Sequence, residues 1–125
     1  MKQSEILTMN DQMNAAVNEL IEKIRVDYFR FLSRMGDGPE PSPFAQQQMD
    51  NFYNDIEVAP GSKYIKIIRE RCVWGFIVNT DNDKKFKRGD ILKAAGWAAP
   101  ARNKARGNIL EKDFSWVQWT GPAYL

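Results

Sequence analysis

Two arginines in one short segment are the side chains of this sequence best suited to binding chemistry. Arg102 and Arg106 stand four residues apart between Pro100 and Gly107, and a proline near the start with a glycine after the end is typical of a short helix. Residues four apart share one face of a helix, so the two guanidiniums would form a fork suited to phosphate oxygens. Free N–H groups at the start of that helix would strengthen the same site. The spacing therefore predicts an anion-binding site.

Three neighbours of the arginines would adapt this site to a larger ligand. Trp97 follows Gly96 and lies three residues before Pro100. Its ring could stack on a nucleobase, a contact worth about 1–3 kcal/mol. Asn103 and Asn108 could donate to and accept from a base or a sugar. The predicted ligand-binding residues are Trp97, Arg102, Asn103, Arg106 and Asn108. The alternative is that the two arginines pair with carboxylates of the acidic N-terminal half, and the sequence leaves both interpretations open.

A second group of cations surrounds Phe86, ahead of the arginine segment. It is interpreted either as a solvated hairpin turn or as a contact for a polyanion backbone, because Lys and Arg side chains neutralise phosphates. The possible polyanion contacts are Lys84, Lys85, Lys87, Arg88 and Lys104.

The residues that are missing narrow the chemistry. Histidine is absent, and Cys72 is the single cysteine. This excludes a zinc site of the usual N/S type and a Cys–His or Ser–His nucleophile pair. A hydrolase that uses only carboxylates stays possible, but no pair of acids stands out, so we expect no enzyme, no cofactor and no metal ion. Because no disulfide can form within the chain and no apolar run approaches ~18 residues, we expect a cytoplasmic protein with no membrane partner.

The 125 residues are enough for one domain with a modest core, and their charges are unevenly divided. Residues 1–60 contain 5 Lys and Arg against 10 Asp and Glu, a net charge of −5. Residues 61–125 contain 13 against 6, a net charge of +7. Blocks of opposite sign indicate that the two parts face different partners or each other. We therefore predict a single domain, 1–125, with a helical acidic part and a β-rich basic part.

A long amphipathic helix is predicted from Met9 to Met35, because apolar residues recur there every three or four positions. These positions are Met13, Val17, Leu20, Ile24, Tyr28, Phe31 and Met35. At ~1.5 Å per residue the helix would be roughly 40 Å long, more than a domain of this size requires. It either lies across the protein's own sheet or packs partly against a second copy, so one expectation is a homo-oligomer formed through this helix.

A short second helix and a small sheet are predicted to follow. Ser42 as N-cap and Pro43 at the first helical position begin the helix, and residues 59–62 form a turn. The predicted buried contacts of this helix are Phe44, Met49 and Phe52. The predicted strands span residues 64–68, 72–78, 90–95 and 114–119, with a break at 121–122. The segment 90–95 could also be a helical turn, but the glycines on either side of it favour a strand. The fold class is therefore α+β, with a long N-terminal helix and a short second helix packed on a small antiparallel β-sheet.

The basic part also contains all four tryptophans. Trp74 lies in the middle of a predicted strand and is predicted to be in the core. Trp116 and Trp119 are three residues apart, so a regular strand directs them to opposite faces. One of these two is therefore expected to be exposed.

The stretch from residue 85 to residue 108 resembles a motif of small tailed-phage proteins, carried by KFKRGDILKAAGWAAPA at residues 85–101 and ARGN at residues 105–108. The resemblance leaves the helical residues 1–60 outside it. It implies a phage origin and a location in the host cytoplasm. Phage accessory proteins of this size are frequently counter-defence factors, and one class of them sequesters nucleotide immune signals. The resemblance itself implies little about activity: such a role is inferred from this class of phage protein and from the predicted anion-binding chemistry, and no ligand residue is carried over.

Three functions remain open from the sequence. The leading hypothesis is non-enzymatic binding of a phosphorylated small molecule, such as a nucleotide signal, with the arginines on phosphate and Trp97 on the base. The second is a nucleic-acid-binding module whose lysines and arginines contact the backbone. The third is an inhibitor that binds a host or defence enzyme through its acidic helical part.

Overall fold

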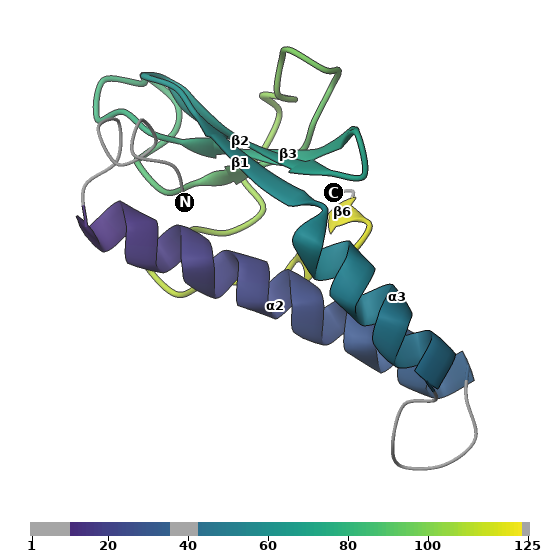
Figure 1. Cartoon of the computed structure of the whole chain (residues 1–125). Helices are drawn as coiled ribbons and strands as arrows, with labels where there is room; N and C mark the ends of the chain where they lie inside the picture. Colours follow the sequence, from purple (N-terminus) through teal and green to yellow (C-terminus); the bar gives the residue numbers. More distant parts are fainter. Residues whose placement is uncertain (1–10, 36–42, 124–125) are drawn as a thin grey trace.

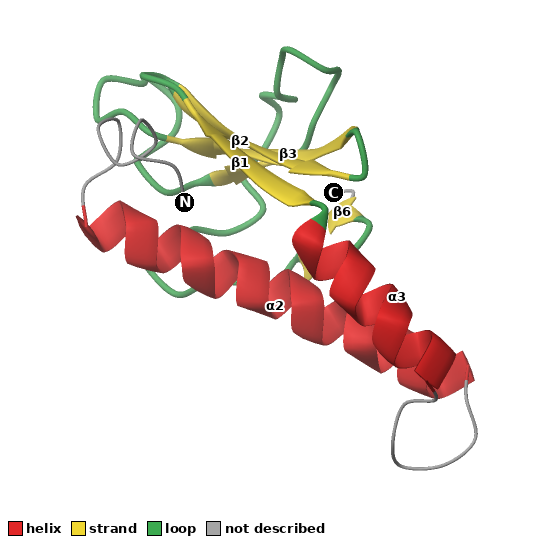
Figure 2. Ribbon diagram, viewed as in Figure 1, coloured by secondary structure: helices red, strands yellow, loops and turns green. Residues whose placement is uncertain are grey.

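Two helices lie on one side of a small sheet (Figures 1 and 2). The computed structural model describes residues 11–35 and 43–123. Helix α2 spans Asp11–Met35, and helix α3 spans Pro43–Asn54 and returns along the far end of α2. The predicted α+β class, with a long first helix and a short second helix, is confirmed.

The main sheet is antiparallel, with its four strands adjacent in chain order. Its strands are β1 (Ile56–Pro60), β2 (Tyr64–Arg69), β3 (Cys72–Val78) and β4 (Ile91–Leu92). A separate ribbon pairs β5 (Val117–Gln118) with β6 (Gly121–Pro122). The strands predicted at 64–68 and 72–78 are confirmed, whereas the strand predicted at 90–95 is confirmed only at Ile91 and Leu92.

Helix α2 buries its apolar stripe against the sheet. Met13, Val17 and Leu20 are fully buried, and Ile24 and Tyr28 are at most 9% exposed. The sheet residues of the same cluster are Ile65, Ile67, Trp74 and Ile77. Complete burial of such a side chain stabilises a fold by about 1.5–3 kcal/mol. For residues 13–28, packing on the protein's own sheet is therefore confirmed.

A bulge in β3 turns Trp74 toward α2. The pairing of β2 with β3 slips by one residue between Ile67 and Ile68, opposite Trp74. An extra residue reverses the alternation of side chains, so Trp74 shares the α2 face with Ile77 while Phe76 lies on the other face. Its indole N–H donates to a backbone carbonyl of β5 at 2.8 Å. The predicted place of Trp74 in the core is confirmed.

Loops cover the opposite face of the sheet (Figure 1). Phe76, Val78, Phe86 and Leu92 form a second buried cluster there. Phe86 comes from the loop after β3 and is 6% exposed. This cluster anchors residues 79–107 on the face away from α2, which is where the candidate site lies.

Two segments predicted to be a turn and the end of a strand belong, at least in part, to strands in the structure. Ala59 and Pro60 belong to β1, an edge strand, where proline is tolerated because its missing N–H is not needed in the ladder. The turn follows them, and the Gly61 N–H donates to the carbonyl of Tyr64 at 2.9 Å. Residues 121–122 form β6 and pair with β5 instead of ending a strand. The strand predicted at 114–119 is correspondingly short.

The second helix begins at Pro43 as predicted, but its predicted contacts are only partly confirmed. Phe52 is 1% exposed, whereas Phe44 is 70% exposed, so the prediction for Phe44 is wrong. Phe44 lies in the first turn of α3, at the end remote from the sheet and its core (Figure 1). Ser42 and the side chain of Met49 lie outside the described residues.

The C-terminal ribbon packs on α2 through one of its two tryptophans. The Trp119 ring lies 4.9 Å from the rings of both Tyr28 and Phe31, and its backbone N–H donates to Asp27 at 2.9 Å. Trp116 is 46% exposed. The prediction that one of these two tryptophans is exposed is confirmed.

Candidate functional site

The segment between Pro100 and Gly107 is not a helix, so that prediction is wrong. Its backbone runs beside the β4 region instead. The N–H of Ala101 donates to the carbonyl of Lys93, and the N–H of Arg106 donates to the carbonyl of Ile91, both at 2.7 Å. These tertiary hydrogen bonds replace the i to i−4 bonds of a helix. The two arginines therefore do not share a helical face.

Arg106 is a structural residue rather than part of an open site. It is 2% exposed, and its Nε–H donates to the carbonyl of Ala123 at 3.0 Å. Its Nη1 donates to Asn103 Oδ1 at 2.9 Å and to the carbonyl of Lys104 at 2.6 Å. Arg106 thus ties the C-terminal segment to the loop through neutral acceptors. Among the described residues, no carboxylate of the acidic half pairs with Arg106.

Asn108 is also buried, at 3% exposure. Its amide donates to the carbonyl of Arg88 and to Asp90 Oδ1, both at 2.9 Å. Its oxygen accepts from the N–H groups of Leu110 and Glu111 at 2.8 and 3.0 Å. Because four hydrogen bonds saturate the side-chain amide, Asn108 has no capacity left for a ligand.

Arg102 is held by two residues that the sequence did not identify. Its Nη1 and Nη2 donate to the two oxygens of Asp83 at 2.9 Å each, and Nη1 donates to the Tyr64 hydroxyl at 2.5 Å. The Asp83 side chain is only 2% exposed and also accepts from the N–H groups of Lys85 and Phe86. Hydrogen bonds from Arg102, then from these backbone groups, hold the pKa of the Asp83 carboxyl well below its usual range. The same pair raises the pKa of Arg102.

One edge of the Arg102 guanidinium is still open. A guanidinium has five N–H donors, and Asp83 with Tyr64 uses three of them. Among the described residues nothing accepts from Nε–H or from the second hydrogen of Nη2. These two donors are parallel, which matches the spacing of two phosphate oxygens. The side chain as a whole is 38% exposed.

Arg102 lines a cleft of about 640 Å³ at one end of the sheet. The cleft lies between the β1–β2 turn and the loop after β3. Its lining residues are Ser62, Lys63, Thr80, Asn82, Asp83, Lys84 and Arg102. Three of them are cations, and Arg102 neutralises the single carboxylate. Sites for small molecules commonly have volumes of about 300–1,000 Å³, so the cleft has the size and the charge to hold a small anion.

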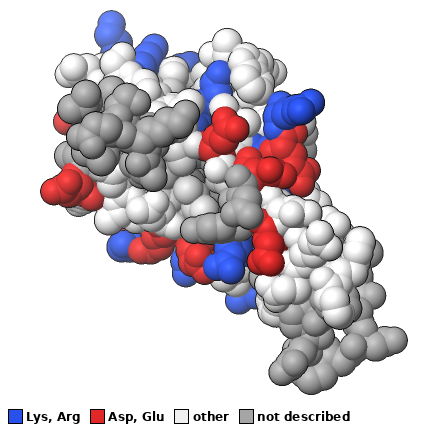
Figure 3. Space-filling view, in the orientation of Figure 1, with Lys and Arg blue, Asp and Glu red and all other residues white. Residues whose placement is uncertain are grey.

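The distribution of charge over the surface agrees with this placement. Figure 3 shows Lys and Arg side chains along the upper rim of the molecule, on the sheet side, whereas acidic and basic side chains alternate along the lower edge.

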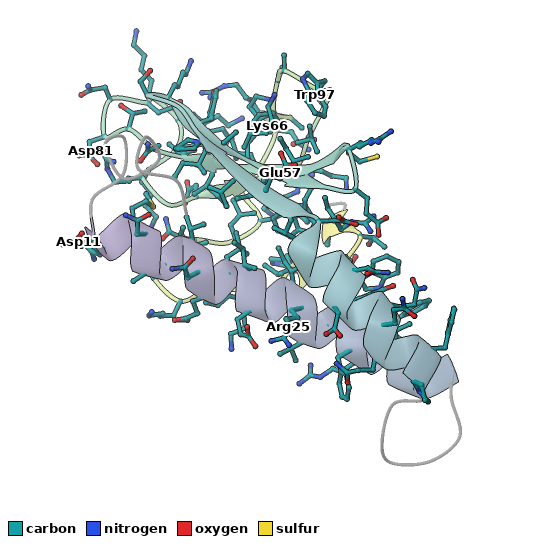
Figure 4. The ribbon with its side chains drawn as sticks, viewed as in Figure 1. Asp11, Arg25, Glu57, Lys66, Asp81 and Trp97 are labelled. Carbon is teal, nitrogen blue, oxygen red and sulfur yellow. The ribbon has the colours of Figure 1, made fainter. Side chains whose placement is uncertain are left out.

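Trp97 is exposed beside this basic face, at 57% of its area. Its loop is closed by hydrogen bonds from the N–H groups of Ala95 and Gly96 to the carbonyl of Ala99, at 3.0 and 3.1 Å. Figure 4 shows Trp97 close to Lys66 on the side of the sheet away from α2. The Lys66 ammonium lies 4.5 Å from the centre of the indole ring. Trp97 is therefore accessible to a ligand.

The predicted polyanion contacts have diverging environments. Lys84 and Lys104 are exposed. The other three contact protein groups: Lys85 donates to the carbonyl of Arg102, Lys87 pairs with Glu111, and Arg88 pairs with Asp81 at 3.0 Å. Of these five residues, only Lys84 lines the cleft.

The fold and the cleft define an α+β protein with an open basic cleft at one end of a small antiparallel sheet. The chain belongs to a family of unknown function, DUF7717, whose model matches residues 2–125. No curated protein and no solved structure matches the chain. In the described part of the chain, neither helix has the length and apolarity to cross a membrane.

Proposed function

We propose that this protein binds a phosphorylated small molecule without transforming it. The observation that carries the proposal is the open donor edge of Arg102 in a cleft that also contains Lys63 and Lys84. Asp83 and Tyr64 orient the guanidinium before any ligand arrives. Preorganised donors lose little conformational freedom on binding, and this favours affinity. The hydroxyls of Ser62 and Thr80 and the amide of Asn82 add polar groups for the remaining oxygens of a phosphate.

The ionisable groups of the cleft support binding rather than catalysis. Asp83 is the one carboxylate among its described lining residues. The lowered pKa of this carboxyl makes it a poor proton acceptor near neutral pH, because a general base is most effective when its pKa lies near the working pH. Its oxygens are moreover engaged by Arg102 and by two backbone N–H groups.

A nucleic-acid-binding module is the second candidate, favoured by cations outside the cleft. Lys104 is exposed, and Lys66 lies beside the exposed Trp97. A strand of nucleic acid that followed these groups would contact several of them at once. Its affinity would then fall steeply with salt, since each neutralised phosphate releases counterions.

Titration with inorganic pyrophosphate tests the proposal. We expect calorimetry to detect binding by the intact protein and to show that Lys63→Ala with Lys84→Ala weakens it at least about tenfold, because a hydrogen bond to a charged group contributes about 1.5–3 kcal/mol. Lys112→Ala is the matched control, because Lys112 pairs with Glu19 on α2 and does not line the cleft. Equal affinity in the double variant and the control would contradict the proposal.

The narrower prediction is a tailed-phage counter-defence factor that sequesters a nucleotide immune signal. Its phage origin rests on the resemblance of residues 85–108, and its role rests on the class of such proteins and on the anion-binding chemistry. It stays a prediction. Native mass spectrometry of freshly purified protein checks it, because a tightly bound signal would be retained and weighed with the chain.

A further inference from the structure

We infer that Trp97 is a stacking platform for a nucleobase, and that the ligand of the cleft is therefore a nucleotide. This inference rests on the proposed function, since it places the phosphate groups of the same ligand beside Arg102. The base would lie on the exposed indole ring, and the sugar would cross the sheet surface between the two.

The Trp97 loop presents its ring in a defined position. Its backbone is closed by the hydrogen bonds to Ala99, and the N–H of Ala101 fixes the end of the loop on Lys93. The residues that flank the ring, 95, 96, 98 and 99, are small and exposed. A Cβ added to Gly96 would meet nothing within 4 Å. A planar group therefore has room to approach Trp97.

Lys66 adds a charge that favours a nucleotide over a neutral planar ligand. Its ammonium lies 4.5 Å from the ring centre, within the range of a cation–π contact. This contact restrains the indole and places the cation over one face of the ring, so a base would stack on the opposite face. A base carried by a phosphorylated sugar brings negative charge near this cation, whereas an unphosphorylated aromatic compound does not.

The phosphate site and the stacking site lie on adjacent outward positions of the same strand. Tyr64, whose hydroxyl accepts from Arg102 at 2.5 Å, and Lys66 are two residues apart on β2. Residues two apart point to the same face and are separated by roughly 7 Å. Trp97 and Arg102 also belong to one continuous loop. We therefore take the ligand that would reach both halves of the site to be a nucleoside diphosphate, which joins a base to two phosphates through one sugar.

An exposed tryptophan on an apolar loop also suits a protein partner, but its surroundings favour a base. Interfaces between proteins have cores depleted in charge. Trp97, in contrast, contacts a lysine and lies on the same face of the sheet as Arg102. Stacking beside cations is the arrangement by which proteins hold single bases.

The test compares nucleotides with the phosphate group alone. Calorimetric affinities of ADP, GDP, UDP and CDP are measured against inorganic pyrophosphate on the full chain. All four are expected to bind more tightly than pyrophosphate, by between about 5- and 150-fold, because every base has a face that can stack. Trp97→Ala is expected to abolish this advantage and to leave pyrophosphate affinity unchanged, whereas Trp97→Phe retains most of it. Trp116→Ala, which removes another exposed tryptophan, is the matched control.

Each outcome separates the inference from the proposed function. Pyrophosphate binding that depends on Lys63 and Lys84, without any advantage for nucleotides, overturns the inference and leaves the proposed function standing. If the intact protein does not bind pyrophosphate at all, both the inference and the proposed function are overturned. Oligo(dT) distinguishes the two sources of a phosphorylated base. If the affinity for oligo(dT) exceeds that for every free nucleotide and depends on Trp97, the stacking platform serves a single strand of nucleic acid, and the inference of a free nucleotide is overturned. If Trp97→Ala changes only the capture of a protein partner, the inference is wrong.

Discussion

Asp83 and Arg102, 19 residues apart in the sequence, are joined by two hydrogen bonds of 2.9 Å, and the carboxylate side chain is only 2% exposed. This pair connects the loop after β3 with the segment after β4. It also decides which edge of the guanidinium is left for a ligand. Under the proposed function the pair therefore contributes to both stability and binding, and each role can be tested.

Protonation of Asp83 is expected to weaken the fold in acid. The folded-state pKa is lower than that of the unfolded chain, so below about pH 4 the unfolded state binds more protons. The stabilisation is fully present above the ordinary carboxyl pKa and is lost as the pH falls toward the lowered value. Thermal unfolding should show a lower Tm for Asp83→Asn than for the wild type at pH 7, and a difference that shrinks below pH 4. Asp81→Asn is the control, since that exposed carboxylate is screened by solvent.

Phe86 should be the main anchor of the loop that shapes the cleft. Its ring is buried in the second cluster, and the Arg102 guanidinium lies 5.0 Å from its centre. Truncating a buried phenylalanine costs about 3–5 kcal/mol. We expect Phe86→Ala to lower the free energy of unfolding in urea by an amount in or just below this range. A loss under 1 kcal/mol would show that the cluster does not hold the loop.

The amide of Asn108 should be essential to the turn that follows it. Replacement by alanine leaves the N–H groups of Leu110 and Glu111 and one oxygen of Asp90 without this partner. Each buried group left unsatisfied costs about 1–3 kcal/mol. We expect Asn108→Ala to destabilise the fold by at least about 2 kcal/mol in urea titrations. The same replacement at the exposed Asn103 should cost less, so equal losses would contradict this account.

Two glycines provide a matched test of backbone demands. Gly107 has φ of 118°, and a Cβ there would lie 2.4 Å from the carbonyl oxygen of Asp113. Gly96 has open space around the same position. We expect Gly107→Ala to destabilise the protein strongly and Gly96→Ala to be tolerated or slightly stabilising. Parallel measurements of Tm check both, and a reversed order would refute the loop conformation described above.

The homo-oligomer predicted from the length of the first helix stays a prediction. Val26 and Phe31 of α2 are each 38% exposed and would carry the contact. We expect sedimentation analysis to detect a dimer that Val26→Glu converts into a monomer. Phe44→Glu, on α3, is the comparison that distinguishes the two helices. A wild-type protein that sediments as a monomer at all concentrations would reject the prediction.

Part of the site was accessible from the sequence. The exposure of Trp97 and the cationic character of Lys84 and Arg102 follow from local composition. Asp83, Tyr64 and Lys63 were missed, because each enters the site through a contact between segments distant in the sequence. The proline and glycine around 100–107 also misled, since a short helix is marginal by itself and hydrogen bonds to residues 91–93 outweigh its propensity.

The sequence by itself determined the elements whose pattern is periodic. The 3.6-residue recurrence of apolar side chains defines α2, and the β-branched runs define β2 and β3, because these patterns report which face of each element must leave water. Only the tertiary structure decided which polar groups are buried and which groups they hydrogen-bond to. Arg102 is open on one edge and Arg106 is closed, although both are arginines of one segment, because the partners that satisfy a guanidinium are supplied by distant parts of the chain.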